Sequence, residues 1–222
     1  MPLFEAVLFD CDGVLVDSEP LTNRVLRDML AARGWDMSQE ECMRTFVGKA
    51  VKDEAARIEQ HTGQPVTTAW LQDFWAQRNL VLERELEPIP GAPAAVRAIH
   101  AAYDGRIACA SGADRRKVVL QLEKVGIFDC FDGRIFSGHE MPRSKPAPDV
   151  YLAAAAALGA NPARCAVVED TVTGATAGLA AGATVFGYCP GGPSHSSAHE
   201  MRALGVQVLF HDMDELPALL AD

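Results

Sequence analysis

The chain has 222 residues, 49% of them hydrophobic, and a formal charge of −10 at pH 7. This length and apolar content predict a globular protein with one large domain, or one domain that carries a smaller insert. The acidic balance and the lack of a basic run in the sequence argue against binding to nucleic acid or to an anionic membrane.

Six cysteines lie far apart in the sequence and form no Cys-x-x-Cys pair, which predicts reduced, mostly buried thiols and no zinc site. The first residues show neither the basic start nor the apolar stretch of a secretion signal, and no run of about 18 apolar residues occurs. We therefore expect a cytoplasmic protein, and we expect it to be a monomer or a weak dimer.

The apolar residues 6–9 predict a buried strand, which the acidic segment Asp10-Cys11-Asp12-Gly13 follows directly. Because side chains alternate along an extended chain, Asp10 and Asp12 leave the backbone on the same side, and Cys11 packs on the other. Two carboxylates this close repel each other unless a hard cation such as Mg²⁺ joins them. The chemical interpretation is a nucleophile beside a proton donor, although Asp and Gly are also ordinary turn residues.

A calcium-binding loop of the EF-hand type also begins with alternating acidic residues. That loop requires Gly at its sixth position and Glu at its twelfth. Here these positions hold Leu15 and Leu21, which excludes the calcium loop.

Residues 18 to 87 predict no strand and four successive amphipathic helices. The first is expected to begin at Ser18 as N-cap with Pro20 in its first turn, and the second opens with a capping box. The expected boundary residues of the helices are Ser18, Gly34, Ser38, Gly63 and either Thr67 or Thr68.

We predict that residues 17–87 form a helical cap inserted into an α/β core of residues 1–16 and 88–222. The chain then passes between the two parts twice, near residues 14–17 and 87–91. A hinge made of two chain segments suits a lid.

After the insert, apolar runs alternate with helical patterns, which predicts a doubly wound, Rossmann-like parallel sheet. The predicted strands cover residues 107–110, 134–136, 165–168, 183–186 and 206–210. The helical patterns cover residues 118–122, 151–158 and 173–181.

Reactive side chains follow the predicted strands at the edge where parallel sheets bind ligands. Ser111 and Gly112 follow the second strand, Lys145 lies in the loop after the third, and Glu169 and Asp170 follow the fourth. Each has an ordinary alternative: Ser111 can cap the next helix, Lys145 can be a solvated charge, and the acidic pair can form a helix N-cap. In one crevice they could instead hold an anion, neutralise a phosphoryl group and bind Mg²⁺.

With the motifs Asp10-x-Asp12-Gly13, Ser111-Gly112, Lys145-Pro146 and Glu169-Asp170 in this order, the chain resembles the haloacid dehalogenase superfamily. The similarity lies in the branch of small-sugar phosphatases and β-phosphoglucomutase, covers nearly the whole chain, and includes a cap where the helical insert falls. Residues 136–138 and 185–189 are also similar to bacterial 6-phosphogluconate phosphatase.

The resemblance implies that Asp10 attacks phosphorus to form an aspartyl-phosphate, while Asp12 protonates the leaving alkoxide and then deprotonates water. It implies Mg²⁺ as cofactor and a small phosphorylated metabolite, a sugar or sugar-acid phosphate monoester, as substrate. The implied metal ligands are Asp10, Asp12 through its carbonyl, Asp170 and, in support, Glu169; the implied phosphate-binding residues are Ser111, Gly112 and Lys145.

Alternatives within the superfamily differ in the cap and in the second acid. An acid at Asp12 favours phosphorus chemistry over carbon–halogen cleavage, and residues 21–33 lack the lysine expected of a phosphonatase. The histidine and arginine that support the second phosphate in β-phosphoglucomutase match Thr22 and Val51 here, which disfavours a phosphohexomutase without excluding it.

Two features of the predicted cap and core bear on the remaining hypotheses. Lys49 and Lys52 can bind a substrate carboxylate or phosphate, or they can be solvated charges at a helix start. A third hypothesis is a catalytically idle regulatory module that binds metal or phosphate, and the intact set of core motifs argues against it.

Overall fold

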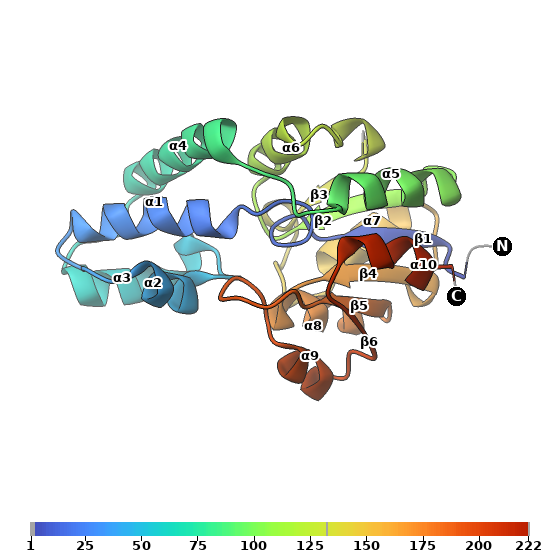
Figure 1. The fold of residues 1–222 in the computed structure, drawn as a ribbon. Coiled ribbons are helices and arrows are strands. Elements are labelled where there is room, and N and C mark those ends of the chain that lie inside the picture. The colour runs from blue at the N-terminus through green and yellow to red at the C-terminus, as the bar shows by residue number, and fades with distance from the viewer. Residues whose placement is uncertain (1–2, 132, 222) are drawn as a thin grey trace.

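The structure is a computed structural model that describes residues 3–131 and 133–221. Its strands form one parallel sheet in the order β3-β2-β1-β4-β5-β6, so the first strand lies in the middle (Figure 1). The strands are β1 (Ala6–Phe9), β2 (Ile107–Ser111), β3 (Ile135–Ser137), β4 (Cys165–Glu169), β5 (Thr184–Tyr188) and β6 (Val208–Phe210). The predicted doubly wound α/β fold is confirmed.

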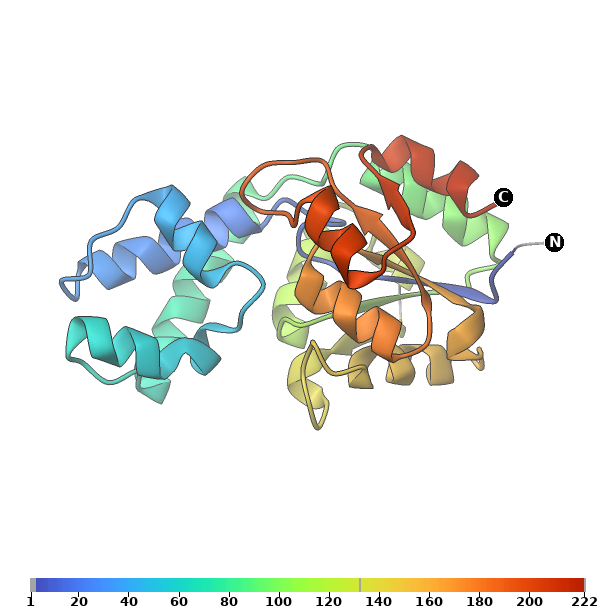
Figure 2. The ribbon, with the colours of Figure 1, turned by 90° about the horizontal axis from the view of Figure 1, so that it is seen from below.

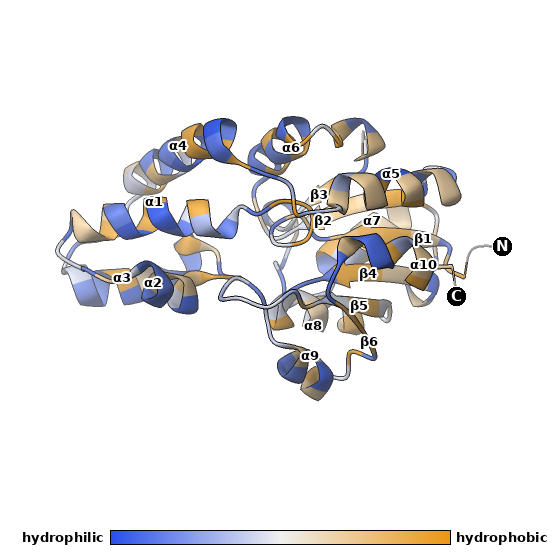
Figure 3. Cartoon of the chain, in the orientation of Figure 1, coloured by the Kyte–Doolittle hydropathy of each residue, from blue (hydrophilic) through white to orange (hydrophobic). Residues whose placement is uncertain are grey.

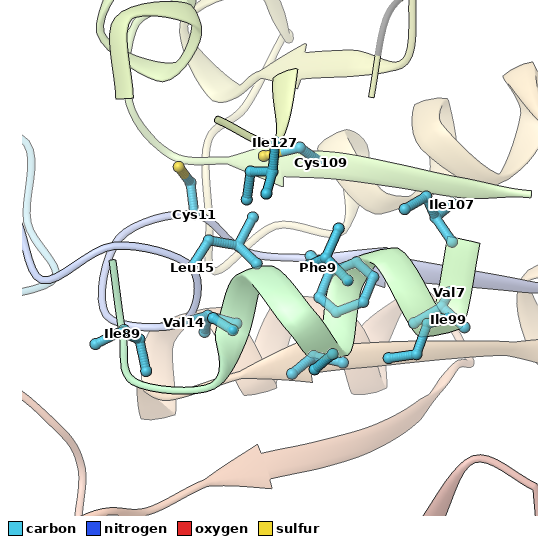
Figure 4. Packing of buried hydrophobic residues seen from close by; sticks show 14 of the residues in the cluster. Val7, Phe9, Cys11, Val14, Leu15, Ile89, Ile99, Ile107, Cys109 and Ile127 are labelled. Carbon is cyan, nitrogen blue, oxygen red and sulfur yellow. The ribbon is translucent and has the colours of Figure 1, made fainter. Parts of the chain in front are cut away.

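The central strands are buried along their whole length because helices cover both faces of the sheet. Val7 and Phe9 of β1 point into one hydrophobic cluster, and Ala6 and Leu8 point into the other. Figure 4 shows the first cluster, where Ile99 packs next to Val7. Burying each large side chain of this kind contributes roughly 1.5–3 kcal/mol to folding.

Six helices cover the sheet, three on each face (Figures 1 and 2). The first face carries α5 (Ala92–Ala102), α6 (Arg115–Lys124) and α10 (Leu216–Leu219). The second face carries α7 (Asp149–Ala157), α8 (Val172–Ala180) and α9 (Ala198–Leu204). Short 3₁₀ turns are η1 (Val51–Glu54), η2 (Phe128–Phe131), η3 (Gly138–Glu140), η4 (Pro162–Arg164) and η5 (Met213–Glu215).

The other four helices lie to one side of the sheet and pack around a core of their own (Figure 2). They are α1 (Glu19–Ala31), α2 (Gln39–Phe46), α3 (Ala55–Thr62) and α4 (Thr68–Glu85). Their ribbons alternate between hydrophilic and hydrophobic residues in Figure 3, whereas β1 and β4 are mostly hydrophobic. Leu26, Phe46, Ile58 and Phe74 are the centre of this second core.

The two segments that connect the helical group to the sheet run side by side. The Asp17 amide donates to the Glu87 carbonyl at 3.0 Å, and the Ile89 amide donates to the Leu15 carbonyl at 3.1 Å. Val16 also forms an antiparallel bridge with Pro88. These bonds tie the two connections into one narrow ribbon.

Most predicted boundaries agree with the structure, including the capping box at Ser38 and the N-cap at Thr67. Ser18 occupies the predicted N-cap position of α1, but its hydroxyl donates to Asp12 and makes no capping bond to the helix. Helix α1 also ends at Ala31, three residues before Gly34. Helices α5, α9 and α10 lie outside the predicted set.

Two further expectations concern the whole chain. All six cysteines are buried and free, as predicted. Within residues 3–131 and 133–221, every helix is too short or too polar to cross a membrane.

Candidate active site

A cavity of about 360 Å³ is lined by residues that follow the strands and by residues of α1, α4 and the loop before η1. Every predicted site residue except Ser111 lines it. The lining residues from the sheet side include Asp10, Asp12, Gly112, Lys145, Glu169 and Asp170, and those from the helical side include Lys49, Lys52 and Arg78.

Lys145 joins two of the carboxylates at the end of the sheet. Its Nζ atom lies 2.7 Å from Asp10 Oδ1 and 2.7 Å from Glu169 Oε1. It also donates to the Tyr151 hydroxyl at 2.9 Å, and that hydroxyl donates to Glu169 Oε1 at 2.6 Å. The lysine is therefore not a solvated charge, and Tyr151 is a partner that the sequence motifs did not predict.

Asp10, Glu169 and Asp170 form a cluster whose ligand oxygens all lie within 4.8 Å of one another. All three residues are buried, and both carboxylate oxygens of Asp170 lack a hydrogen-bond partner. A buried carboxylate without donors is costly, so this donor set fits a hard cation that takes oxygen ligands. Mg²⁺ is such a cation, and the residues present suit it.

The excess of negative charge in the cluster also favours a bound cation. Burial raises the pKa of Asp10 to about 7, with the charge of Lys145 acting against it and that of Glu169 adding to it. Burial and then the charge of Glu169 raise the pKa of Asp170 well above its usual value. Three carboxylates share one lysine, so a bound cation would lower both pKa values.

Two glycines make room for the cluster. A Cβ atom on Gly13 would lie 2.1 Å from Asp170 Oδ2, and one on Gly174 would lie 1.8 Å from Glu169 Oε1. Gly13 also has a φ of +76°, which residues with a side chain rarely adopt. The backbone can approach the carboxylates only because these positions lack side chains.

Asp12 has a separate set of partners. Lys117 Nζ lies 2.7 Å from Asp12 Oδ1, the Gln121 amide donates to the same oxygen at 2.8 Å, and the Ser18 hydroxyl donates to it as well. Burial acts to raise the pKa of Asp12, but the charge of Lys117 and these hydrogen bonds lower it to about 2. Lys117 and Gln121 were not predicted, although their spacing of four residues places both on one helix face.

The ordinary alternatives for the remaining motifs do not apply. Ser111 is fully buried and accepts a hydrogen bond from the Ala113 amide at 3.0 Å, whereas Asp114 is the N-cap of α6. Thr171 is the N-cap of α8, which leaves Glu169 and Asp170 without a capping role.

The helical side of the cavity carries cationic side chains. Lys49 lies 3.7 Å from Glu54 and donates to the Thr45 carbonyl at 2.8 Å. Lys52 lines the cavity. Burial lowers the pKa of His139, which follows β3, and the positive charge of Lys52 lowers it further. Arg78, which was not predicted as a site residue, is buried on α4.

A family model described as haloacid dehalogenase-like hydrolase matches residues 4–182. The 6-phosphogluconate phosphatase of Escherichia coli (strain K12) is 32% identical over 190 residues, or 85% of this chain and 84% of that protein. Hexitol phosphatase B of the same strain is 33% identical over 180 residues, or 79% of each chain.

A solved structure is similar over the whole length. The crystal structure of a HAD family hydrolase from Deinococcus radiodurans R1, with bound phosphate and sodium, has a TM-score of 0.79 and 36% sequence identity. The similarity covers 100% of this chain and 96% of that one.

Proposed function

The chain belongs to the haloacid dehalogenase-like hydrolases, and on this premise we propose that it hydrolyses a small sugar or sugar-acid phosphate monoester through an aspartyl-phosphate at Asp10. The observation that carries the proposal is the buried carboxylate cluster with Lys145 Nζ 2.7 Å from Asp10 Oδ1. The names of two relatives, a 6-phosphogluconate phosphatase and a hexitol phosphatase, support the class of substrate.

The proposed metal is Mg²⁺, held by Asp10, Asp170 and the carbonyl of Asp12, with Glu169 in support. When bound, it would neutralise charge on the phosphoryl oxygens and on the nucleophile. Support comes from the two buried Asp170 oxygens that lack hydrogen-bond donors. The phosphate and sodium in the Deinococcus radiodurans relative agree with a site for an anion and a cation in this family.

In the first step, an oxygen of Asp10 attacks phosphorus and the bond to the ester oxygen breaks. Asp12 passes a proton to that oxygen. Lys145 balances the phosphoryl charge, and the segment Ser111-Gly112 helps to bind the phosphoryl oxygens. In the second step, Asp12 takes a proton from water, which attacks the aspartyl-phosphate and frees Asp10.

The cavity suits a polar, anionic substrate. Lys49, Lys52 and Arg78 line its helical side together with the acidic Glu19, Asp53 and Glu54, so cationic groups are within reach of an anionic substrate although the chain as a whole carries −10. The Thr22 hydroxyl lines the same cavity and is buried without a partner, so it can bind a sugar hydroxyl. A cavity of about 360 Å³ lies within the range of small-molecule sites.

We also propose that residues 17–87 act as a cap that opens and closes on the paired connections. The ribbon of Leu15–Asp17 and Glu87–Ile89 holds few backbone bonds, and the four helices have an apolar cluster of their own. Leu15, Val16 and Ile89 pack in the cluster on the sheet, so the ribbon stays anchored there when the helices rotate. Closure would bring Lys49 and Lys52 closer to the substrate and exclude water from the phosphoryl transfer.

The deciding experiment is a panel of phosphorylated metabolites assayed with and without Mg²⁺ for phosphate release and for isomer formation. We expect Mg²⁺-dependent phosphate release, and none from the Asp10→Asn variant, whose amide fits the same space but cannot attack. Isomer formation would favour the phosphohexomutase, and silence across the panel would favour the idle module. Full activity of Asp10→Asn would overturn the assignment of the nucleophile.

A further inference from the structure

Asp12 receives all its side-chain hydrogen bonds on one oxygen. Lys117 Nζ at 2.7 Å, Gln121 Nε2 at 2.8 Å and the Ser18 hydroxyl all contact Oδ1. Among the described residues, none donates to Oδ2. The Asp12 side chain is 15% exposed and lines the cavity, so its second oxygen has no partner except what enters there.

Two of the three contacts to Oδ1 come from helix α6 of the core. Lys117 and Gln121 lie one turn apart on the buried side of α6, and the side chain of Lys117 is only 5% exposed. The Cys11 thiol donates to Gln121 Oε1 at 3.4 Å, which turns the amide nitrogen toward Asp12. Burying a lysine is costly unless it is paired, and here its partner is the proposed acid.

We propose that Lys117 and Gln121 are positioning residues that fix the plane of the Asp12 carboxylate and reserve Oδ2 for proton transfer. The proton then leaves Oδ2 for the ester oxygen as the phosphorus–oxygen bond breaks, and a proton of the attacking water returns to Oδ2 as the aspartyl-phosphate is hydrolysed. This inference rests on the proposed phosphatase function, and it assigns a role to α6 that no motif carries.

A different role for Lys117 would be direct binding of the substrate phosphate, since it also lines the cavity. The two roles differ in what a substitution changes. A phosphate ligand contributes to KM and to transfer of the phosphoryl group from any ester. A residue that orients Asp12 matters for kcat, and it matters most when the leaving group needs a proton.

The test compares Lys117→Met and Gln121→Leu with the wild type on two esters. One is the best alkyl phosphate from the panel, and the other is p-nitrophenyl phosphate, whose leaving group needs little protonation. We expect kcat for the alkyl ester to fall about 10- to 100-fold with KM within about threefold, because general acid–base catalysis contributes about 10²–10⁴-fold in all. The rapid release of nitrophenol in the first turnover should stay close to the wild-type rate, and Lys117→Arg should recover part of the loss.

The decisive readout is the Asp12→Asn background, where the nitrophenol release in a single turnover is still measurable. There we expect Lys117→Met to add no further loss, because its effect passes through Asp12. An additional loss in that background, a large rise in KM, or an unchanged kcat for the alkyl ester would overturn the inference.

Two controls keep the outcome interpretable. Thermal unfolding shows whether each variant folds. If Lys117→Met does not fold, Gln121→Leu, which removes no charge, tests the positioning role alone. If the wild type hydrolyses no ester, or if Asp12→Asn is fully active, the proposed function itself fails and not the role of Lys117.

Discussion

At the scale of single residues, the site depends on positions that carry no side chain. Gly13 and Gly182 both have a positive φ, +76° and +84°. They differ in surroundings, because a Cβ on Gly13 would lie 2.1 Å from Asp170 Oδ2, whereas one on Gly182 would meet nothing within 4 Å. The pair therefore separates backbone strain from steric conflict with the proposed metal ligand.

We predict that Gly13→Ala and Gly182→Ala each lower the free energy of unfolding by about 1–2 kcal/mol, the cost of a left-handed conformation for a residue with Cβ. Only Gly13→Ala should also lose Mg²⁺-dependent phosphatase activity, because the new methyl group displaces Asp170. Chemical denaturation and a Mg²⁺ titration of activity check both parts. Equal activity of the two variants would show that Asp170 can move without consequence.

The residues found from the sequence and those missed differ in a physical way. Asp10, Lys145 and Asp170 follow strands of a parallel sheet, so a local pattern is enough to bring them to one edge. Lys117 and Tyr151 reach the site from helices, and their direction depends on how each helix packs against the sheet. Ser18 was assigned a local role as N-cap, because the sequence does not show that its hydroxyl has the stronger acceptor Asp12 within reach.

At the scale of elements, α4 and α6 are joined by an ion pair across the two cores. Arg78 Nη2 lies 2.9 Å from Asp114 Oδ2, and Asp114 caps α6 by accepting from the Lys117 amide at 2.9 Å. Burial acts to raise the pKa of Asp114, but the charge of Arg78 and the bond to Lys117 lower it below its ordinary value of 3.8. The helix that holds Asp12 is therefore tied to the helical side of the cavity.

We predict that Arg78→Met lowers the free energy of unfolding by about 1–3 kcal/mol at pH 7, because a charged hydrogen bond is lost while the aliphatic stem is kept. Because the pKa of Asp114 is lower in the folded state than in the unfolded state, its ionised form stabilises the protein at pH values above the unfolded-state pKa. This contribution is lost as the pH falls through the folded-state pKa. The difference between variant and wild type should therefore shrink below about pH 4. Denaturation at pH 7 and pH 3.5 measures it.

The control for this pair is Arg24→Met, which breaks an ion pair with Glu85 whose side chains are 39% and 41% exposed. Its effect should stay below about 1 kcal/mol at either pH, as for other surface pairs. A loss for Arg78→Met that does not change with pH would assign its contribution to the contacts with Asn79 and Phe74, not to the ion pair with Asp114.

The predicted elements also show what the sequence can and cannot indicate. Strands β1, β2 and β4 are buried on both faces, so each contains an apolar run that is clear in the sequence. Helix α9 has seven residues and was missed, although the capping box at Ser197 and Glu200 was a usable signal. Helix α10 has only four residues, which is too short for a periodic pattern.

At the scale of the whole molecule, the buried negative charge opposes folding of the metal-free protein. The chain carries −10 overall, and three carboxylates with one lysine lie at the end of the sheet. Both oxygens of Asp170 are buried without donors, so this residue costs the most when no cation is present. The free energy of unfolding should therefore depend on Mg²⁺ through the cluster of Asp10, Glu169 and Asp170.

We predict that Asp170→Asn is more stable than the wild type in EDTA by about 1–3 kcal/mol, because it removes a buried carboxyl group that no hydrogen-bond donor contacts. In Mg²⁺ at 100 times its Kd, the wild type should gain about 2.7 kcal/mol, since only the folded state binds the ion. The variant should gain little, so the difference in the free energy of unfolding between variant and wild type narrows or changes sign. Chemical denaturation in EDTA and in Mg²⁺ gives all four values.

The matched control is Asp129→Asn, which removes one negative charge from a side chain that is 75% exposed. If relief of the net charge were the cause, this variant would be stabilised in EDTA as much as Asp170→Asn. We expect instead that Asp129→Asn follows the wild type within about 0.5 kcal/mol in both conditions, as surface substitutions do. Equal stabilisation of wild type and Asp170→Asn by Mg²⁺ would place the ion elsewhere, and the chemistry assigned to Asp10 would then lose its cation.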